Sequence, residues 1–127
     1  MAMNPFRRDS DPAEFLPLTP VAFDILLSLA DGEQHGYSIM RAVQERTGGA
    51  VEFHAGTLYR ALNRLLSQGL IVELDDRPAP ELDDQRRRYY RMTPLGAQVL
   101  RAEARRLESQ VLAARARHLL PSRGRRS

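Results

Sequence analysis

The sequence predicts a mainly α-helical domain with one small β hairpin and a long helix at the C-terminal end. Three observations support this prediction: two threonine–proline pairs typical of helix starts, apolar residues with helical spacing, and two short runs with the composition of strands. With 127 residues, 43% hydrophobic and 28% charged, the chain has the size and composition of one compact domain. We therefore expect a single apolar core.

The N-terminal half predicts an arm and two helices. Residues 1–18 contain prolines and mixed charges without periodicity, so we expect a flexible arm, although Phe15-Leu16 could still dock on another surface. Thr19 has the character of a helix cap and is followed by a proline at the first helical position, so a largely apolar helix should run to about Ala30. A second, amphipathic helix should begin near Gly36, with His35 capping or orienting its start.

The third predicted helix, from about Ala55 to Gln68, has one apolar side and one polar side. At about 100° per residue its leucines gather on the first side. The second side carries Gly56, Thr57, Arg60, Asn63, Arg64 and Ser67, with Tyr59 at its edge. No acidic residue occurs between Phe53 and Leu70, whereas a merely solvated helix normally mixes both signs of charge. These side chains hydrogen-bond base edges and phosphates, so the face is typical of a major-groove reader; a surface helix that happens to lack acids is the alternative.

Two strand-like runs, residues 70–74 and 88–92, follow and flank a polar loop at 75–87. Alternation places Tyr90 on the core side. The tip of the loop is acidic and should be repelled by DNA, so any DNA contact of this hairpin should come from the arginines at its base, Arg86, Arg87 and Arg88. Three helices followed by a hairpin is the order of a winged helix-turn-helix, which predicts a DNA-binding domain at residues 19–93.

A long helix should open after Thr93 and cover residues 94–120. Six residues along it are spaced alternately by four and three, as in a coiled-coil seam: Leu100, Ala104, Leu107, Val111, Ala114 and His118. A helix of this length exceeds so small a core, and a second copy of the chain is the simplest partner, so we expect a dimerisation helix and a homodimer. Residues 121–127 are expected to form a basic, disordered tail.

Several classes of function are excluded by composition. The chain has no cysteine, three scattered histidines, no phosphate-binding loop and no hydrolase signature, so we expect no enzyme, no metal and no cofactor. No stretch is apolar enough for a membrane span or a signal peptide, so we expect a cytoplasmic protein without membrane contact.

Motifs over residues 20–120 occur in an order that points to one family. They are His35-Gly36-Tyr37-Ser38-Ile39, Gly56-Thr57-Leu58-Tyr59, Gly69-Leu70-Ile71 and the run from Arg88 to Gly96. Together they resemble the PadR-like transcriptional regulators. The resemblance implies a winged-helix repressor, homodimeric through its terminal helix and often responsive to small aromatic or cationic compounds. It also implies that the third helix reads the operator and that Tyr59 lies near the phosphate backbone.

The sequence thus predicts a dimeric, sequence-specific DNA-binding transcriptional regulator, most simply a repressor of a palindromic operator in double-stranded DNA. The residues expected at the DNA are Tyr37, His54, Gly56, Thr57, Tyr59, Arg60, Asn63, Arg64, Arg86, Arg87 and Arg88. Instead of contacting DNA, Tyr37 could make a structural hydrogen bond to the protein backbone. Instead of pointing at a phosphate, His54 could mark a looser start of the third helix. The dimer interface is the expected place for any small-molecule effector. The alternative function is a winged-helix module that binds another protein through its acidic hairpin tip and long helix, which the net charge of only +3 favours.

Overall fold

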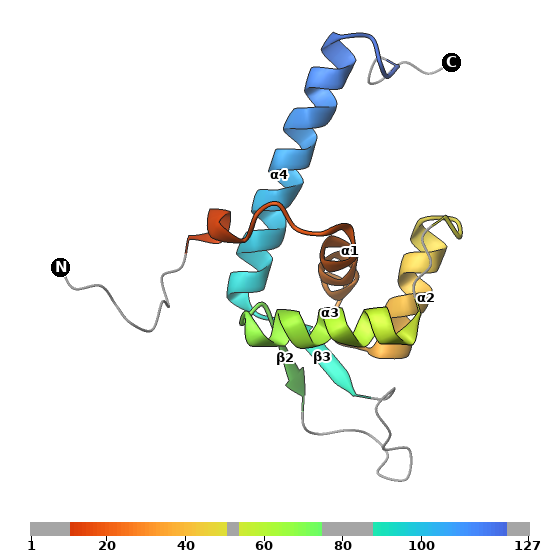
Figure 1. Cartoon of the computed structure of the whole chain (residues 1–127), viewed down its shortest axis with the longest axis vertical. Helices are drawn as coiled ribbons and strands as arrows, with labels where there is room; N and C mark the ends of the chain where they lie inside the picture. The colour runs from red at the N-terminus through yellow and green to blue at the C-terminus, as the bar shows by residue number, and fades with distance from the viewer. Residues whose placement is uncertain (1–10, 51–53, 75–87, 122–127) are drawn as a thin grey trace, which may run out of the picture.

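The computed structural model describes residues 11–50, 54–74 and 88–121 (Figure 1). These ranges hold η1 (Pro12–Phe15, a 3-10 helix), α1 (Pro20–Leu29), β1 (Gln34–His35), α2 (Gly36–Arg46), α3 (Ala55–Ser67), β2 (Ile71–Leu74), β3 (Tyr89–Met92) and α4 (Pro94–Ala116). The predicted fold, mainly helical with a hairpin and a long last helix, is confirmed.

Three α-helices begin where a side chain satisfies a free backbone N–H group of the first turn. Oγ1 of Thr19 accepts a hydrogen bond from the N–H of Ala22 at 3.1 Å at the start of α1. Oγ1 of Thr93 accepts in the same way, at 3.0 Å, at the start of α4. Nδ1 of His35 accepts from the N–H of Ser38 at 3.1 Å and caps α2. These caps confirm the helix starts predicted from the sequence.

The hairpin is part of a three-stranded antiparallel sheet with the order β1-β3-β2. β2 and β3 form the predicted hairpin, with Ile71 opposite Met92 and Leu74 opposite Tyr89. β1 pairs with the other edge of β3 and places His35 opposite Tyr89. The sequence does not predict β1, because a strand of two residues has no periodicity to recognise.

The core lies where α1, α2 and α3 meet the sheet and the first half of α4. Tyr90 is 3% exposed, as predicted, and its burial, reinforced by the charge of Glu73, raises its pKa to about 12. The buried apolar residues of this cluster are Ile25, Leu26, Leu29, Ile39, Leu58, Leu62, Leu65, Leu70, Ile71, Tyr90, Val99 and Leu100.

The start of α4 is fixed to the turn between α3 and β2. A Cβ on Gly96 would collide with the carbonyl oxygen of Leu70 and would lie 2.9 Å from Cγ of Met92, so only glycine fits. The N–H of Thr93 donates to the carbonyl of Leu70 at 3.0 Å, and its hydroxyl donates to the carbonyl of Gly69 at 2.7 Å. The direction of α4 is therefore set by the same turn that ends α3.

Residues 11–18, expected as the end of a flexible arm, are ordered in the structure, so the expectation is wrong for them. Phe15 and Leu18 pack against the core, and the N–H of Leu18 donates to the carboxylate of Glu103 on α4 at 3.1 Å. We call residues 11–18 the N-terminal strap. Sequence periodicity misses the strap because isolated apolar side chains make its contacts, and no repeating face does.

α4 begins in the core and then extends beyond the other elements (Figure 1). Leu100, predicted in a dimer seam, is buried in the core of its own chain, so that assignment is wrong. The helix ends at Ala116, before the predicted end, and His118 lies past it with a left-handed φ of 64°, so it is not in a helical seam either. Between these limits Val111 is 39% and Leu112 is 53% exposed.

Candidate nucleic-acid interface

α3 presents a polar face without acidic residues at the surface. Leu58, Leu62 and Leu65 are at most 1% exposed and hold the other face against the core. The structure brings the predicted α3 candidates to one side of the helix, where Thr57 is half-buried and the exposed residues are Gly56, Arg60, Asn63 and Arg64. The local reason is the spacing of the leucines, which leaves the residues between them facing solvent.

α2 crosses the start of α3 at a glycine. A Cβ on Gly36 would lie 2.7 Å from Oη of Tyr59 and 3.4 Å from Cδ2 of Leu58, so a larger residue would displace the tyrosine ring. Two motifs that are distant in the sequence therefore meet at this crossing. Tyr59 is half-buried there, whereas Tyr37, the next residue of α2 after the glycine, is 50% exposed.

The first turn of α3 is open to anions. His54 occupies the N-cap position but makes no hydrogen bond to the helix with its side chain, and it is exposed together with Ala55 and Gly56. Uncapped N–H groups at a helix start carry partial positive charge. Within the described ranges neither Arg60 nor Arg64 has an ion pair or a side-chain hydrogen bond, so both guanidinium groups leave an uncompensated positive charge on α3.

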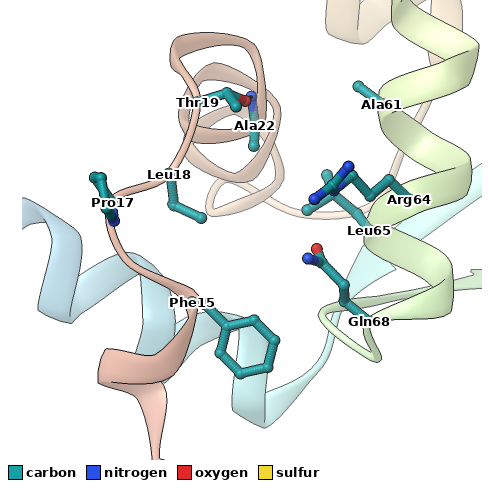
Figure 2. Close-up of a pocket in the computed structure, with 9 residues that line it drawn as sticks. All are labelled: Phe15, Pro17, Leu18, Thr19, Ala22, Ala61, Arg64, Leu65 and Gln68. Carbon is teal, nitrogen blue, oxygen red and sulfur yellow. Dashed lines mark hydrogen bonds between the residues drawn. The ribbon is translucent and has the colours of Figure 1, made fainter.

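Arg64 differs from Arg60 in its surroundings. Figure 2 shows Arg64 beside a small cavity between α3, the start of α1 and the N-terminal strap, with Gln68 one turn further along. Arg60 does not line this cavity. Arg64 therefore lies on the flank of the polar face that points toward the strap.

Among the arginines predicted at the base of the hairpin, Arg86 and Arg87 lie outside the described residues, as does the acidic tip of the loop. Arg88 is described: its Nη1 lies 3.2 Å from Oε2 of Glu73 on the neighbouring strand, and its side chain is 42% exposed. An ion pair this exposed contributes little and exchanges readily, so it leaves Arg88 free to bind another anion.

The sequence does not predict one buried ionic site on α4. The carboxylate of Glu103 is 2% exposed and accepts hydrogen bonds from Nε and Nη2 of Arg106 at 2.7 and 2.9 Å, in addition to the one from Leu18 in the strap. The bonds from Arg106 lower the pKa of Glu103 and outweigh the burial, which raises it. The only sequence signal is a glutamate three residues before an arginine on a helix, which does not distinguish a buried pair from a surface pair.

The described part of the chain contains neither a group of metal-binding side chains nor a membrane-spanning helix. In residues 11–50, 54–74 and 88–121, no three histidine, aspartate or glutamate side chains are grouped so that they could hold a metal ion. None of the helices described is both long enough and apolar enough to cross a lipid bilayer.

The family model described as "Transcriptional regulator PadR-like family" matches residues 25–102, which run from α1 through the first part of α4. The chain belongs to the PadR-like family of transcriptional regulators. The resemblance seen in the sequence motifs is thereby confirmed. Gly36 and Gly96, which allow the two close crossings in this PadR-like chain, both lie within the matched segment.

Two relatives match the PadR-like chain in sequence. The transcriptional regulator Rv3488 of Mycobacterium tuberculosis is 38% identical over 88 residues, which make up 69% of this chain and 76% of the relative. An uncharacterized 37.1 kDa protein in transposon TN4556 of Streptomyces fradiae is 35% identical over 80 residues, 63% of this chain. Those residues span only 21% of that larger protein.

Two solved structures share the fold. A transcriptional regulator from Clostridium thermocellum superposes with a TM-score of 0.63 at 27% identity, covering 76% of this chain and 87% of that one. Bacillus subtilis PadR, solved in complex with operator DNA, superposes with a TM-score of 0.57 at 24% identity, covering 68% of this chain and 47% of that one. The winged-helix architecture of the PadR-like chain is therefore shared with these regulators.

Proposed function

We propose that this PadR-like regulator binds double-stranded DNA sequence-specifically as a homodimer and represses transcription from a palindromic operator. The observation that carries the proposal is the exposed, acid-free face of α3, with two arginines that are unpaired within the described residues. The fold shared with Bacillus subtilis PadR, which was solved on operator DNA, supports it. A protein that binds an operator must share a compartment with the DNA, so we infer a cytoplasmic location.

On α3 the proposed roles follow from side-chain chemistry. Arg60 and Asn63 are exposed near the centre of the polar face, where arginine suits guanine and asparagine suits adenine in the major groove. The open first turn, with His54 and Gly56, suits a phosphate of the backbone. Thr57 adds a half-buried hydroxyl on the same side.

Beside α3 the proposed contacts position the protein and do not read bases. Tyr37 and Tyr59 flank the crossing of α2 and α3, where a hydroxyl group can reach the phosphate backbone. Arg64 on the flank of the face adds a further phosphate contact. From the hairpin we propose Arg88, together with Arg86 and Arg87, which lie outside the described residues.

The part of α4 from Ala104 to Ala114 is the proposed dimer contact. Leu107 and Ala114 are half-buried, and Val111 and Ala104 are exposed, on a helix whose far end leaves the core. Pairing of two such helices would bury these apolar groups and set the distance between the two α3 helices, and hence the spacing of the operator half-sites. A small-molecule effector at this interface would act by changing that distance.

Substitution of Arg60 tests the assignment of the α3 face. The operator would be located by footprinting on the DNA upstream of the protein's own gene, and binding measured by fluorescence anisotropy. Arg60→Ala should lower operator affinity by about 10- to 100-fold, the usual value of one good base contact, while affinity for unrelated duplex changes less. Arg101→Ala, which removes an exposed arginine from α4, is the matched control.

Salt dependence separates DNA binding from the alternative of a protein-binding module. If the complex is held by contacts to several phosphates, its affinity should fall by orders of magnitude when the salt concentration rises from about 50 mM to 200 mM. The affinity of an apolar protein contact should change little over the same range. Equal operator affinity for Arg60→Ala and the unmodified chain would contradict the assigned face. Absence of binding to every duplex at low salt would contradict the function.

A further inference from the structure

A small cavity lies between the N-terminal strap and the flank of α3 (Figure 2). Its volume is about 100 Å³. The strap contributes Phe15 and Leu18 to its walls, α1 contributes Ala22, and α3 contributes Ala61 and Leu65. These five side chains give the cavity an apolar side, which favours an alkyl group over water.

Two polar side chains, Arg64 and Gln68, lie at this cavity, and Figure 2 shows both turned toward the space between α3 and the strap. Within the described ranges neither side chain has a hydrogen bond or an ion pair. The third polar group, the hydroxyl of Thr19, already accepts a bond from the N–H of Ala22. That hydroxyl still has its own hydrogen to donate, and the guanidinium and the amide have their N–H groups, so all three polar side chains at the cavity can donate to a carboxylate.

We propose that this cavity binds a short aliphatic monocarboxylate, with its alkyl group between the strap and α3 and its carboxylate paired with Arg64. The volume of about 100 Å³ favours a short alkyl group, because a closed apolar cavity that holds benzene measures about 150 Å³. Charge complementarity selects the carboxylate, because a fork of guanidinium N–H groups matches its two oxygens.

The strap wall is anchored from the opposite side. The N–H of Leu18 donates to Glu103, which is 2% exposed and held by Arg106. One wall of the cavity is therefore a segment that is fixed to α4, and a ligand in the cavity would touch both the strap and α3. On the basis of the proposed function, a carboxylate on Arg64 removes a positive charge from the DNA-binding face, so the ligand lowers affinity for DNA.

Calorimetric titration of the full chain without DNA tests the site, with 3-methylbutanoate as the probe. Saturable binding is expected, and 3-methylbutanamide and benzoate should each bind at least ~10-fold more weakly, because the first lacks the charge and the second exceeds the cavity. Equal binding of the amide would overturn the role of Arg64, and equal binding of benzoate would overturn the size argument. No saturable binding of 3-methylbutanoate would overturn the proposal.

Three variants assign the binding to this cavity. Arg64→Gln should lose at least ~10-fold in affinity for 3-methylbutanoate, whereas Arg60→Gln, a matched loss of charge on the same helix outside the cavity, should bind normally. Ala22→Leu should lose binding by filling the cavity while it keeps Arg64. Circular dichroism melts check that each variant folds. Normal binding by Arg64→Gln, or by a folded Ala22→Leu, would overturn the assignment.

The effect on DNA is measured separately. 3-Methylbutanoate should weaken duplex binding by the unmodified chain and leave Ala22→Leu unaffected. If the chain binds duplex normally but binds no carboxylate, the result would contradict the proposed cavity site and leave the proposed function unaffected. If the chain binds the carboxylate but no duplex, the result would support the cavity site and contradict the proposed function.

Discussion

Gly36 and Gly96 each stand where two segments cross without space for a side chain. At the first position the obstacle is the ring of Tyr59, the end of a side chain, and at the second it is the backbone carbonyl of Leu70. A side chain can rotate aside, whereas a carbonyl held by its neighbours cannot move without shifting the turn. The family motifs that contain these glycines are therefore places where two segments of the fold pack closely together.

Gly96→Ala should destabilise the protein by roughly 1–3 kcal/mol, because the added methyl group forces α4 away from the turn at Leu70. Urea unfolding at one fixed protein concentration measures the change. Gly56→Ala is the matched control, since its Cβ would meet only the end of Arg60 at 3.8 Å, and it should cost little or nothing. Unchanged stability of Gly96→Ala would mean that the crossing is looser than described.

Among the elements, α3 and α4 show how far amphipathic spacing reaches. In α3 the period of the leucines corresponds to the buried side, so the polar side follows directly from the sequence. In α4 the period runs through two environments: Leu100 lies in the core, and Val111 is partly exposed beyond it. The spacing alone does not show which of these residues pack in the core and which contact a second chain, because both kinds of contact favour the same spacing.

Val111→Asp should convert the proposed dimer to a monomer without unfolding it, because Val111 is 39% exposed in the chain and a charge would be buried only on pairing. Light scattering after size exclusion reports the mass. Gln110→Asp, at the exposed neighbouring position on α4, should remain dimeric. A Val111→Asp protein that still has twice the monomer mass would show that the dimer contact lies elsewhere.

For the whole molecule, the N-terminal strap connects α4 to the domain that carries α3. Phe15 and Leu18 contribute its apolar contacts, and Glu103 holds it through one backbone hydrogen bond and a bidentate pair with Arg106. Glu103 is 2% exposed and Arg106 is 35% exposed, so removal of Arg106 is costly because it leaves a buried charge without its partner. The contact between the N-terminal strap and α4 therefore depends on the carboxylate staying ionised.

Acid should weaken this connection. The pKa of Glu103 is lower in the folded chain than its usual value of 4.5, mainly because Arg106 donates to it. Its contribution to stability is thus fully present above the unfolded pKa and is lost as the pH falls through the folded pKa.

Urea unfolding from pH ~7 to pH ~3 measures the effect. The unmodified chain should be more stable than Glu103→Gln near neutral pH, and the difference should shrink below pH 4.5. A difference that is the same at both ends of the range would contradict the ionised state. Glu108→Gln, an exposed glutamate on the same helix, serves as the control.

Local signals were sufficient to predict much of this chain. Thr19, His35 and Thr93 mark helix starts through bonds to N–H groups within three residues, and the hairpin strands alternate as their sides require. The candidate residues of α3 could be placed on one side for the same reason. The flanking position of Arg64 could not be predicted, because it depends on a strap more than forty residues earlier in the chain.

The sequence by itself determined the helix starts, the hairpin, the acid-free face of α3 and the family, because each depends on residue types at short, regular spacing. Only the tertiary structure decided that the strap is ordered, that Glu103 is buried, that Leu100 belongs to the core and that a cavity lies beside Arg64. These features arise where segments distant in sequence exclude water together, and burial of that kind depends on what packs against a residue and not on its neighbours in the chain.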